Sequence, residues 1–217
     1  MADLRETVVP LALRRPVVGG LLTLTERFAA AVGLLVLAPL LLLVAVAVLV
    51  SSRGPVVYRQ VRVGQYGRRF TIYKFRTMRA GADAELRALL AERGQTVPTA
   101  FLKIQADPRV TPVGRLLRRT SLDELPQLVD VVKGDMSLIG PRPQTPLEAS
   151  TYDERAWRRL LVRPGLTGLW QVSGRSGLSA EEGLALDAHY VQSWNVRLDL
   201  QVLVRTAGAV VSQRGAH

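Results

Sequence analysis

The chain has 217 residues, no cysteine, two histidines and a formal net charge of +11. This length suits one well-buried core with appendages, and no low-complexity spacer divides it into two domains. The missing cysteines exclude disulfides and thiolate metal sites, and two histidines argue against a histidine-built zinc or iron centre. The positive charge indicates anionic partners, which could be nucleic acid, an acidic lipid surface or small phosphorylated molecules.

The first predicted element is a segment of 23 residues, 28–50, that carries no charge and consists mostly of Leu, Val and Ala. This length is sufficient for a helix that spans a bilayer. A secretory signal peptide fits poorly, because its apolar region has about 7 to 15 residues and begins nearer the N-terminus. We therefore interpret 28–50 as a retained membrane segment.

Two features argue against a simple crossing by this segment. Pro39 lies near its middle and removes a backbone hydrogen bond, which favours a kink. Arginines also flank the segment on both sides, at Arg14, Arg15 and Arg27 before it and at Arg53, Arg59, Arg62, Arg68 and Arg69 after it. Since basic flanks prefer the cytoplasm, we predict a re-entrant helix broken at Pro39. A Pro-kinked helix that crosses the membrane once stays as the alternative.

Three elements are predicted for the chain that follows. Residues 56–78 are rich in Val, Tyr, Phe and Ile and are interrupted at 64–67, which predicts a small β-hairpin. A helix is predicted over 82–93, where leucines recur at helical spacing. A basic amphipathic helix follows, with Val113, Leu116 and Leu117 on one face. Such a helix could lie on an anionic membrane surface.

The next predicted helix carries two adjacent acids at its start. Its apolar positions run from Leu125 to a stop near Gly134, and Ser121 with Glu124 matches a capping box. Pro126 is best tolerated in a first turn, so both signals place Asp123 and Glu124 at the helix N-terminus.

Two more helices are predicted near the C-terminus. Ser179 and Glu182 match a second capping box, and 198–211 is a strongly apolar helix. This last helix could serve the membrane surface or a homodimer contact. The predicted fold class is therefore α+β, mostly helical, with a membrane helix, a small hairpin and amphipathic interfacial helices.

Adjacent acids at a helix start are common as structural caps, but the surroundings of this pair favour chemistry. Arg118 and Arg119 precede it, and the turn 140–143 presents Arg142 after it. These arginines gather phosphate-binding groups around the acids. The helix dipole and the arginines would keep both acids ionised, which suits nucleophilic attack or magnesium ligation.

Six ordered motifs carry a resemblance to a known family: VRVG at 61–64, YKFRTM at 73–78, DPRV at 107–110, RRTSLDELPQ at 118–127, GDMSLIGPRP at 134–143 and RPGLTG at 163–168. Together they resemble the bacterial sugar transferase family, the monotopic polyprenyl-phosphate phosphoglycosyl transferases. The resemblance runs from Arg27 to the C-terminus. It corresponds to the minimal catalytic unit of that family.

The resemblance implies a ping-pong reaction with a covalent intermediate. Asp123 would attack the sugar-bearing phosphate of a UDP-sugar, release UMP and pass the phosphosugar to undecaprenyl phosphate. Glu124 would assist as a base or as a partner in a Mg²⁺ site with Asp123. The product would begin the assembly of an exopolysaccharide, capsule or O-antigen.

The resemblance also implies the residues that bind the substrates. Lys74, Arg118 and Arg142 would contact phosphate groups. The string GLWQVSGR at 168–175 resembles the nucleotide-side loop, so Arg175 is a further candidate donor contact, with a basic loop residue near the membrane as the alternative. The same string favours galactose or glucose and leaves N-acetylated sugars open.

The implied architecture has three parts: a basic N-terminal segment at 1–27, the re-entrant helix at 28–50 and a cytosolic catalytic domain at 51–217. It would lie on the cytoplasmic face of the inner membrane of a bacterium, where the lipid phosphate is accessible. One departure concerns the helix break, which is commonly Ser-Pro in the family but is Ala38-Pro39 here. The serine hydroxyl that could satisfy a freed backbone group is thus missing.

Two non-enzymatic readings compete with this one. A basic membrane-anchored protein that binds anionic lipid would use the acids as a cap and the arginines as a lipid patch. A nucleic-acid binder would explain the net charge, but aromatic residues make up only 6% of the chain and no recognition-helix motif is present. An inactive or differently specific member of the family is a third alternative.

Overall fold

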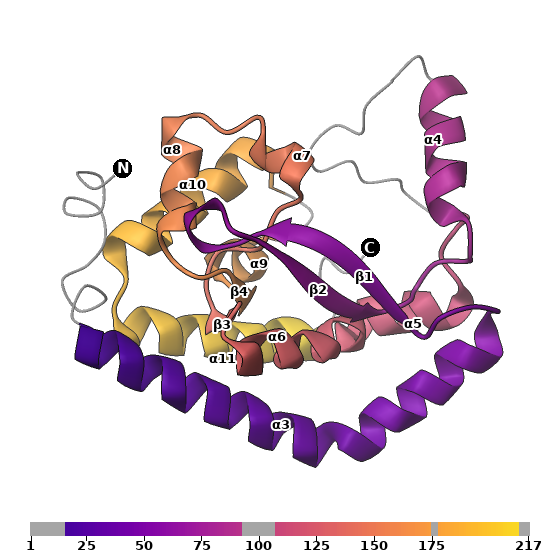
Figure 1. Ribbon diagram of the computed structural model, residues 1–217, viewed down its shortest axis with the longest axis horizontal. Helices are drawn as coiled ribbons and strands as arrows, with labels where there is room; N and C mark the ends of the chain where they lie inside the picture. The colour runs from indigo at the N-terminus through magenta and orange to yellow at the C-terminus, as the bar shows by residue number, and fades with distance from the viewer. Residues whose placement is uncertain (1–15, 93–106, 175–177, 213–217) are drawn as a thin grey trace.

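The computed structural model describes residues 16–92, 107–174 and 178–212. One long helix, α3 (Pro16–Ser51), runs along one side of the molecule, and the remaining elements gather on its concave side (Figure 1). Most of the described residues outside loops are helical, and the strands form two small two-stranded sheets. The prediction of a mostly helical α+β fold is confirmed.

Helix α3 continues through Pro39 and bends into two arms (Figure 1). A proline inside a helix removes one backbone hydrogen bond and clashes with the preceding turn, which explains why α3 bends. The loss of one hydrogen bond does not terminate the helix. The helix begins at Pro16 and so extends beyond the predicted apolar segment on its N-terminal side. Its part from Gly19 to Ser51 is long and apolar enough to cross a membrane.

The two sides of α3 have different surroundings. On the inner side, Ala30 packs against the hairpin and against Leu128 and Val131, and Val44 and Val48 pack with Phe75 and Leu117. The outer side exposes large apolar side chains along both arms: Leu21, Leu24, Phe28, Val32, Leu35, Val36, Leu42, Leu43, Val46, Leu49 and Val50. Water would be a poor solvent for this continuous apolar surface.

The predicted hairpin is confirmed. Strands β1 (Val57–Val63) and β2 (Arg69–Phe75) pair antiparallel, and the short 3-10 helix η1 (Gln65–Gly67) joins them. Alternate side chains of β2, including Phe70 and Ile72, enter the core against α3. The helix predicted to follow is also confirmed, as α4 (Ala82–Glu92).

Helix α5 (Pro112–Thr120) lies close to the end of β2 because of a glycine. A Cβ atom at Gly114 would lie 2.0 Å from the Thr77 carbonyl oxygen, so only glycine permits this approach. On the face predicted to be apolar, Leu117 is buried and Leu116 is 55% exposed. Val113 also packs against the cluster that contains Leu117, so two of the three apolar side chains contact the core.

The acids do not begin an α-helix, contrary to the prediction. They lie in the 3-10 helix η2 (Leu122–Gln127), and α6 (Leu128–Lys133) starts only after it. The predicted capping box at Ser121 and Glu124 is wrong. Ser121 adopts a left-handed conformation with φ of 58° and makes no side-chain cap, because it ends α5 and turns the chain directly into η2.

The second small sheet was not predicted. Strands β3 (Ser137–Ile139) and β4 (Gly165–Thr167) pair in parallel. A Cβ atom at Gly165 would lie 2.0 Å from the Gly140 nitrogen, so the two segments meet through their backbones. Three residues per strand are too few for a periodic sequence signal.

Short helices and a final helical pair complete the body: α7 (Pro146–Ala149), α8 (Glu154–Trp157), η3 (Arg158–Leu161), α9 (Leu169–Ser173), α10 (Ala180–Ser193) and α11 (Val196–Ser212). The capping box at Ser179 and Glu182 is confirmed at the start of α10. The apolar C-terminal helix is confirmed as α11, whose Val202 is buried in a cluster against which Leu22 of α3 packs.

Candidate active site

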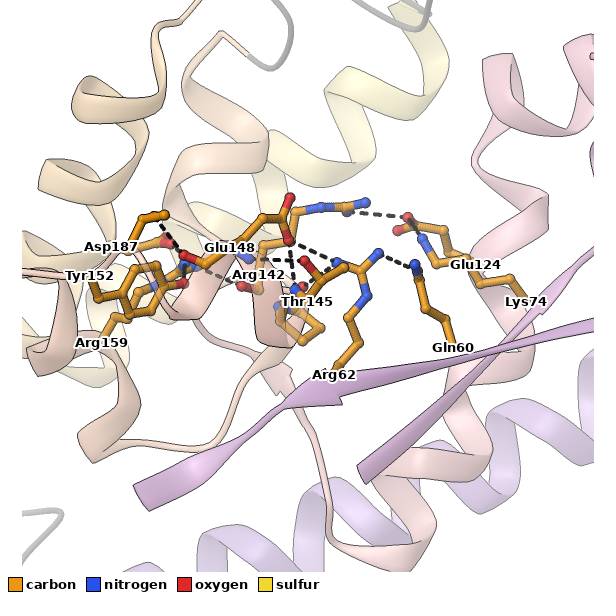
Figure 2. A network of polar contacts seen from close by, with 12 residues as sticks. Gln60, Arg62, Lys74, Glu124, Arg142, Thr145, Glu148, Tyr152, Arg159 and Asp187 are labelled. Carbon is orange, nitrogen blue, oxygen red and sulfur yellow. Dashed lines mark hydrogen bonds and ion pairs between the residues drawn. The ribbon is translucent and has the colours of Figure 1, made fainter. Parts of the chain in front are cut away.

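The acid pair lies where η2 meets the hairpin and the turn that follows β3. Lys74, near the end of β2, places its Nζ 2.7 Å from Glu124 Oε1. Arg142, from the turn, places Nη1 3.2 Å from the same oxygen. Figure 2 shows the two cations approaching Glu124 from different elements. Segments far apart in the sequence therefore converge on one carboxylate.

The two neighbouring acids have opposite electrostatic environments. Within the described part of the chain, both cationic hydrogen bonds at this pair go to Glu124. Although burial opposes it, the charges of Lys74 and Arg142 hold the pKa of Glu124 well below its usual range. Burial, and then the charge of Glu124, raise the pKa of Asp123 to about 6.

We expected the helix dipole and the arginines to keep both acids ionised at neutral pH. Both are ionised at pH 7, but with unequal margins: Glu124 is fixed as an anion, whereas Asp123 becomes protonated below about pH 6. Desolvation and a like charge one residue away outweigh the cations for Asp123, because the cations bond to its neighbour.

Arg118 completes the cluster of cations. Its Nε donates a hydrogen bond to Thr77 Oγ1 over 2.9 Å, which orients the side chain from α5 toward the end of β2. Burial lowers the pKa of Arg118, and the negative charge of Asp123 acts against this shift, so the two groups influence each other. The close approach at Gly114 is what brings this arginine within reach.

The fold thus brings Asp123, Glu124, Lys74 and Arg142 together, with Arg118 beside them. Arg175 lies outside the described residues. A sequence model of the bacterial sugar transferase family matches residues 21–213. The chain belongs to this family.

Three proteins similar to this sugar transferase are named for exopolysaccharide production or for sugar phosphate transfer. The exopolysaccharide production protein ExoY of Sinorhizobium fredii is 43% identical over 194 residues, 87% of this chain and 84% of that protein. The undecaprenyl-phosphate galactose phosphotransferase of Salmonella typhimurium is 43% identical over 166 residues, 76% of this chain and 35% of that protein. The UDP-glucose:undecaprenyl-phosphate glucose-1-phosphate transferase of Caulobacter vibrioides is 42% identical over 188 residues, 83% of this chain and 66% of that protein.

These similarities confirm two predictions from the sequence, the bacterial sugar transferase family and an enzyme that transfers sugar 1-phosphate. They decide against the two non-enzymatic readings. The roles of individual residues in the sugar transferase stay predictions.

The acid pair fits a magnesium ion only in part. Among residues 16–92, 107–174 and 178–212, no group of three or more His, Cys, Asp or Glu side chains could hold a metal. Both cations contact Oε1 of Glu124, so the pair can offer Oε2 and the Asp123 carboxylate. Mg²⁺ commonly takes one or two protein carboxylates and completes its shell with substrate phosphates and water. The donor set therefore suits Mg²⁺ that arrives with a diphosphate.

Sequence reasoning missed a second polar cluster beside the site. Arg159 and Asp187 form a fully buried ion pair, and Arg62 pairs with Glu148. A signal for Asp187 was available, because it lies four residues after Gly183 and three before Tyr190, on the buried face of α10. A charge on such a face requires a partner, but the sequence does not name it.

Proposed function

We propose that this sugar transferase moves a phosphosugar from a UDP-sugar to undecaprenyl phosphate and releases UMP, through a covalent intermediate on Asp123. The observation that carries the proposal is the unequal pair of acids. Glu124 holds the hydrogen bonds of Lys74 and Arg142, which leaves the neighbouring carboxylate to react. With a pKa of about 6, Asp123 is anionic at neutral pH and basic enough to attack phosphorus.

The reaction has two displacements at the same phosphorus. In the first, an Asp123 carboxylate oxygen bonds to the sugar-bearing phosphorus, the bond to the bridging oxygen breaks, and UMP leaves with that electron pair. In the second, a phosphate oxygen of undecaprenyl phosphate attacks the phosphorus and expels the Asp123 carboxylate. The products are UMP and undecaprenyl diphosphosugar, and the enzyme returns to its initial state.

Charge stabilisation comes from the cations around the pair. Lys74, Arg118 and Arg142 would bind phosphate oxygens of the donor and the acceptor, with Arg175 as a further donor contact. A bound Mg²⁺, held by Asp123 and Glu124, would neutralise negative charge on the diphosphate. Glu124, as a permanent anion, keeps Lys74 and Arg142 fixed beside the reacting carboxylate.

The names of two relatives support this choice of substrates. The Caulobacter protein is named for UDP-glucose and undecaprenyl phosphate, and the Salmonella protein for galactose phosphate transfer to undecaprenyl phosphate. The matched region of the Salmonella protein is only 35% of its length, so the comparison concerns only the part that the two chains share. Galactose and glucose are the first sugars to try.

The decisive experiment is a UMP-release assay with purified protein, UDP-galactose or UDP-glucose, Mg²⁺ and undecaprenyl phosphate. Asp123→Asn should reduce UMP release by at least about 10⁴-fold, as expected when a nucleophile is removed. Asp153→Asn is the matched control, because Asp153 caps α8 and asparagine caps equally well. Turnover by Asp123→Asn close to that of the wild type would remove Asp123 as the nucleophile.

The exposed apolar side of α3 supports insertion into a membrane, and its bend supports a re-entrant path. In this arrangement both ends of α3 stay in the cytoplasm, and the site meets the lipid phosphate at the interface. Single cysteines at exposed Gly20 and Arg53 test it. Both should resist an impermeant thiol reagent in intact cells and react after permeabilisation. Labelling of one end alone in intact cells would instead mean a full crossing.

A further inference from the structure

Hydrogen bonds from other segments hold the backbone of the turn that carries Arg142. The carbonyl oxygens of Pro141, Arg142 and Pro143 each accept one: from the Gly165 nitrogen at 2.9 Å, from Arg159 Nη2 at 2.6 Å and from Arg62 Nη1 at 3.2 Å. The two prolines also fix their own φ angles. A turn held in this way fixes the point from which the Arg142 side chain extends toward Glu124.

The first of the two arginines, Arg159, is completely enclosed. Its Nη2 also contacts Asp187, and its Nη1 donates to the Tyr152 hydroxyl at 2.5 Å. The guanidinium therefore serves three partners from three segments at once. Figure 2 shows the resulting chain of contacts from Asp187 through Arg159 to the Arg142 backbone, and from the Arg142 side chain to Glu124 and Lys74.

The second arginine, Arg62, holds the other end of the turn. Its Nη1 lies 3.4 Å from Glu148 Oε2, and its Nη2 lies 2.5 Å from Gln60 Oε1. Glu148 in turn accepts from the Thr145 nitrogen at 2.6 Å, at the start of α7. One arginine from the hairpin and one from η3 thus grip neighbouring carbonyls of the same turn.

This arrangement has an electrostatic cost that its carboxylates offset. Burial and the charge of Arg142 lower the pKa of Arg62 to about 10, and Glu148 acts in the opposite direction. Arg159 has an acid partner of its own, Asp187, and the two form an ion pair without solvent contact. A cluster of like charges is stable here only because each backbone-binding arginine has its own acid.

We infer that Arg159 and Arg62 are positioning residues for catalysis, which hold the Pro141–Pro143 backbone so that the Arg142 guanidinium stays on the acid pair. The inference rests on the proposed function. Both positions require the planar fork of arginine, because a lysine ammonium can keep the carboxylate but cannot also reach the carbonyl and the third partner.

A double-mutant cycle separates positioning from general stability. Arg159→Lys should lower kcat/KM for the UDP-sugar by about 10- to 100-fold, the loss expected when a contact group is misplaced by about 1 Å. In an Arg142→Ala background, the same change should alter kcat/KM by less than about twofold, since the group that it positions is gone. Arg62→Lys, at a less enclosed site, should likewise lower kcat/KM only when Arg142 is present. It provides the test if Arg159→Lys does not fold.

Arg109→Lys is the matched control. Arg109 also joins an acid, Asp107 at 2.5 Å, to a backbone carbonyl, that of Ala82 at 3.1 Å, and neither of these partners belongs to the turn. This change should alter kcat/KM by less than about twofold relative to the parent protein, both in the wild type and in the Arg142→Ala background. Equal losses from Arg159→Lys with and without Arg142 would overturn the inference.

A spectroscopic measurement reports the same contact without turnover. The guanidinium ¹⁵N signals of Arg142, assigned by their loss in Arg142→Ala, should shift in Arg159→Lys and Arg62→Lys and stay in place in Arg109→Lys. Unchanged signals in the first two variants would overturn the positioning role. Absence of UMP release from the wild type would instead overturn the proposed function, so the two failures are distinguishable.

Discussion

Two clusters of acidic and cationic side chains meet at Arg142, and they differ in how completely their carboxylates are paired with cations. In the acid pair, two carboxylates face Lys74, Arg118 and Arg142, yet only Glu124 accepts hydrogen bonds from these cations among the described residues. In the buried pair, Arg159 and Asp187 face each other with only 1% of each side chain exposed. The acid pair, called the open cluster below, keeps one carboxylate, that of Asp123, without a hydrogen bond from these cations in the described part of the chain. The Arg159–Asp187 pair, called the sealed cluster, is enclosed by protein.

The difference shows how this fold separates the residues proposed to react from the residues that hold them in place. A reactive carboxylate must be accessible and must not be consumed by a permanent ion pair. A supporting pair works best when it is enclosed, because a charge buried without its partner is costly and any alternative arrangement is therefore disfavoured. Arg142 belongs to both clusters, since its backbone is held by the sealed pair and its side chain serves the open one.

The largest change in stability is expected in the sealed cluster. Burial raises the pKa of Asp187 to about 6, but Asp187→Asn also leaves the buried Arg159 cation without its acid. This second cost is the larger one, and we expect the free energy of unfolding to fall by about 3–5 kcal/mol at pH 7. Chemical denaturation in detergent measures this value, with Asp153→Asn at an exposed cap as the control. A loss under about 1 kcal/mol would mean that solvent reaches the pair.

In the open cluster we expect smaller changes in the free energy of unfolding, and these differ in sign between Glu124 and Asp123. Glu124→Gln removes an anion that binds two cations and should lower the free energy of unfolding by about 1–3 kcal/mol at pH 7. Asp123→Asn should preserve or raise stability, because folding raises the pKa of Asp123 and so penalises its charged form. Comparable destabilisation by both changes would contradict the asymmetry.

The pH dependence should follow the same asymmetry. The pKa of Asp123 is raised to about 6, so the nucleophile is lost as the pH falls through 6. We expect kcat/KM for the UDP-sugar to be about tenfold lower at pH 5 than at pH 7. The stabilising effect of Asp123→Asn should have the reverse dependence: it is present above pH 6 and disappears below the ordinary pKa of aspartate. A rate that is flat between pH 5 and 7 would contradict a raised pKa.

Several elements could be predicted because their signals are local. The hairpin, α4, α11 and the capping box of α10 follow from residue spacing within each segment. The capping box at Ser121 failed although its pattern is equally local, because the preceding helix ends on the same residue and forces it into a left-handed conformation. Ser121 is both the C-cap residue of α5 and the residue before η2. The sequence pattern of one element alone does not show which of the two sets its conformation.

The sequence by itself determined the apolar helix, the adjacent acids and the supply of arginines, since these depend on residue type and short-range order. Only the tertiary structure decided which acid the cations bind and which arginines hold the turn. Lys74 reaches Glu124 across 50 residues of chain, and Arg62 reaches Pro143 across 81. Hydrogen bonds and desolvation act over a few ångströms in space, so the division of labour between two neighbouring carboxylates was set by segments remote in the chain.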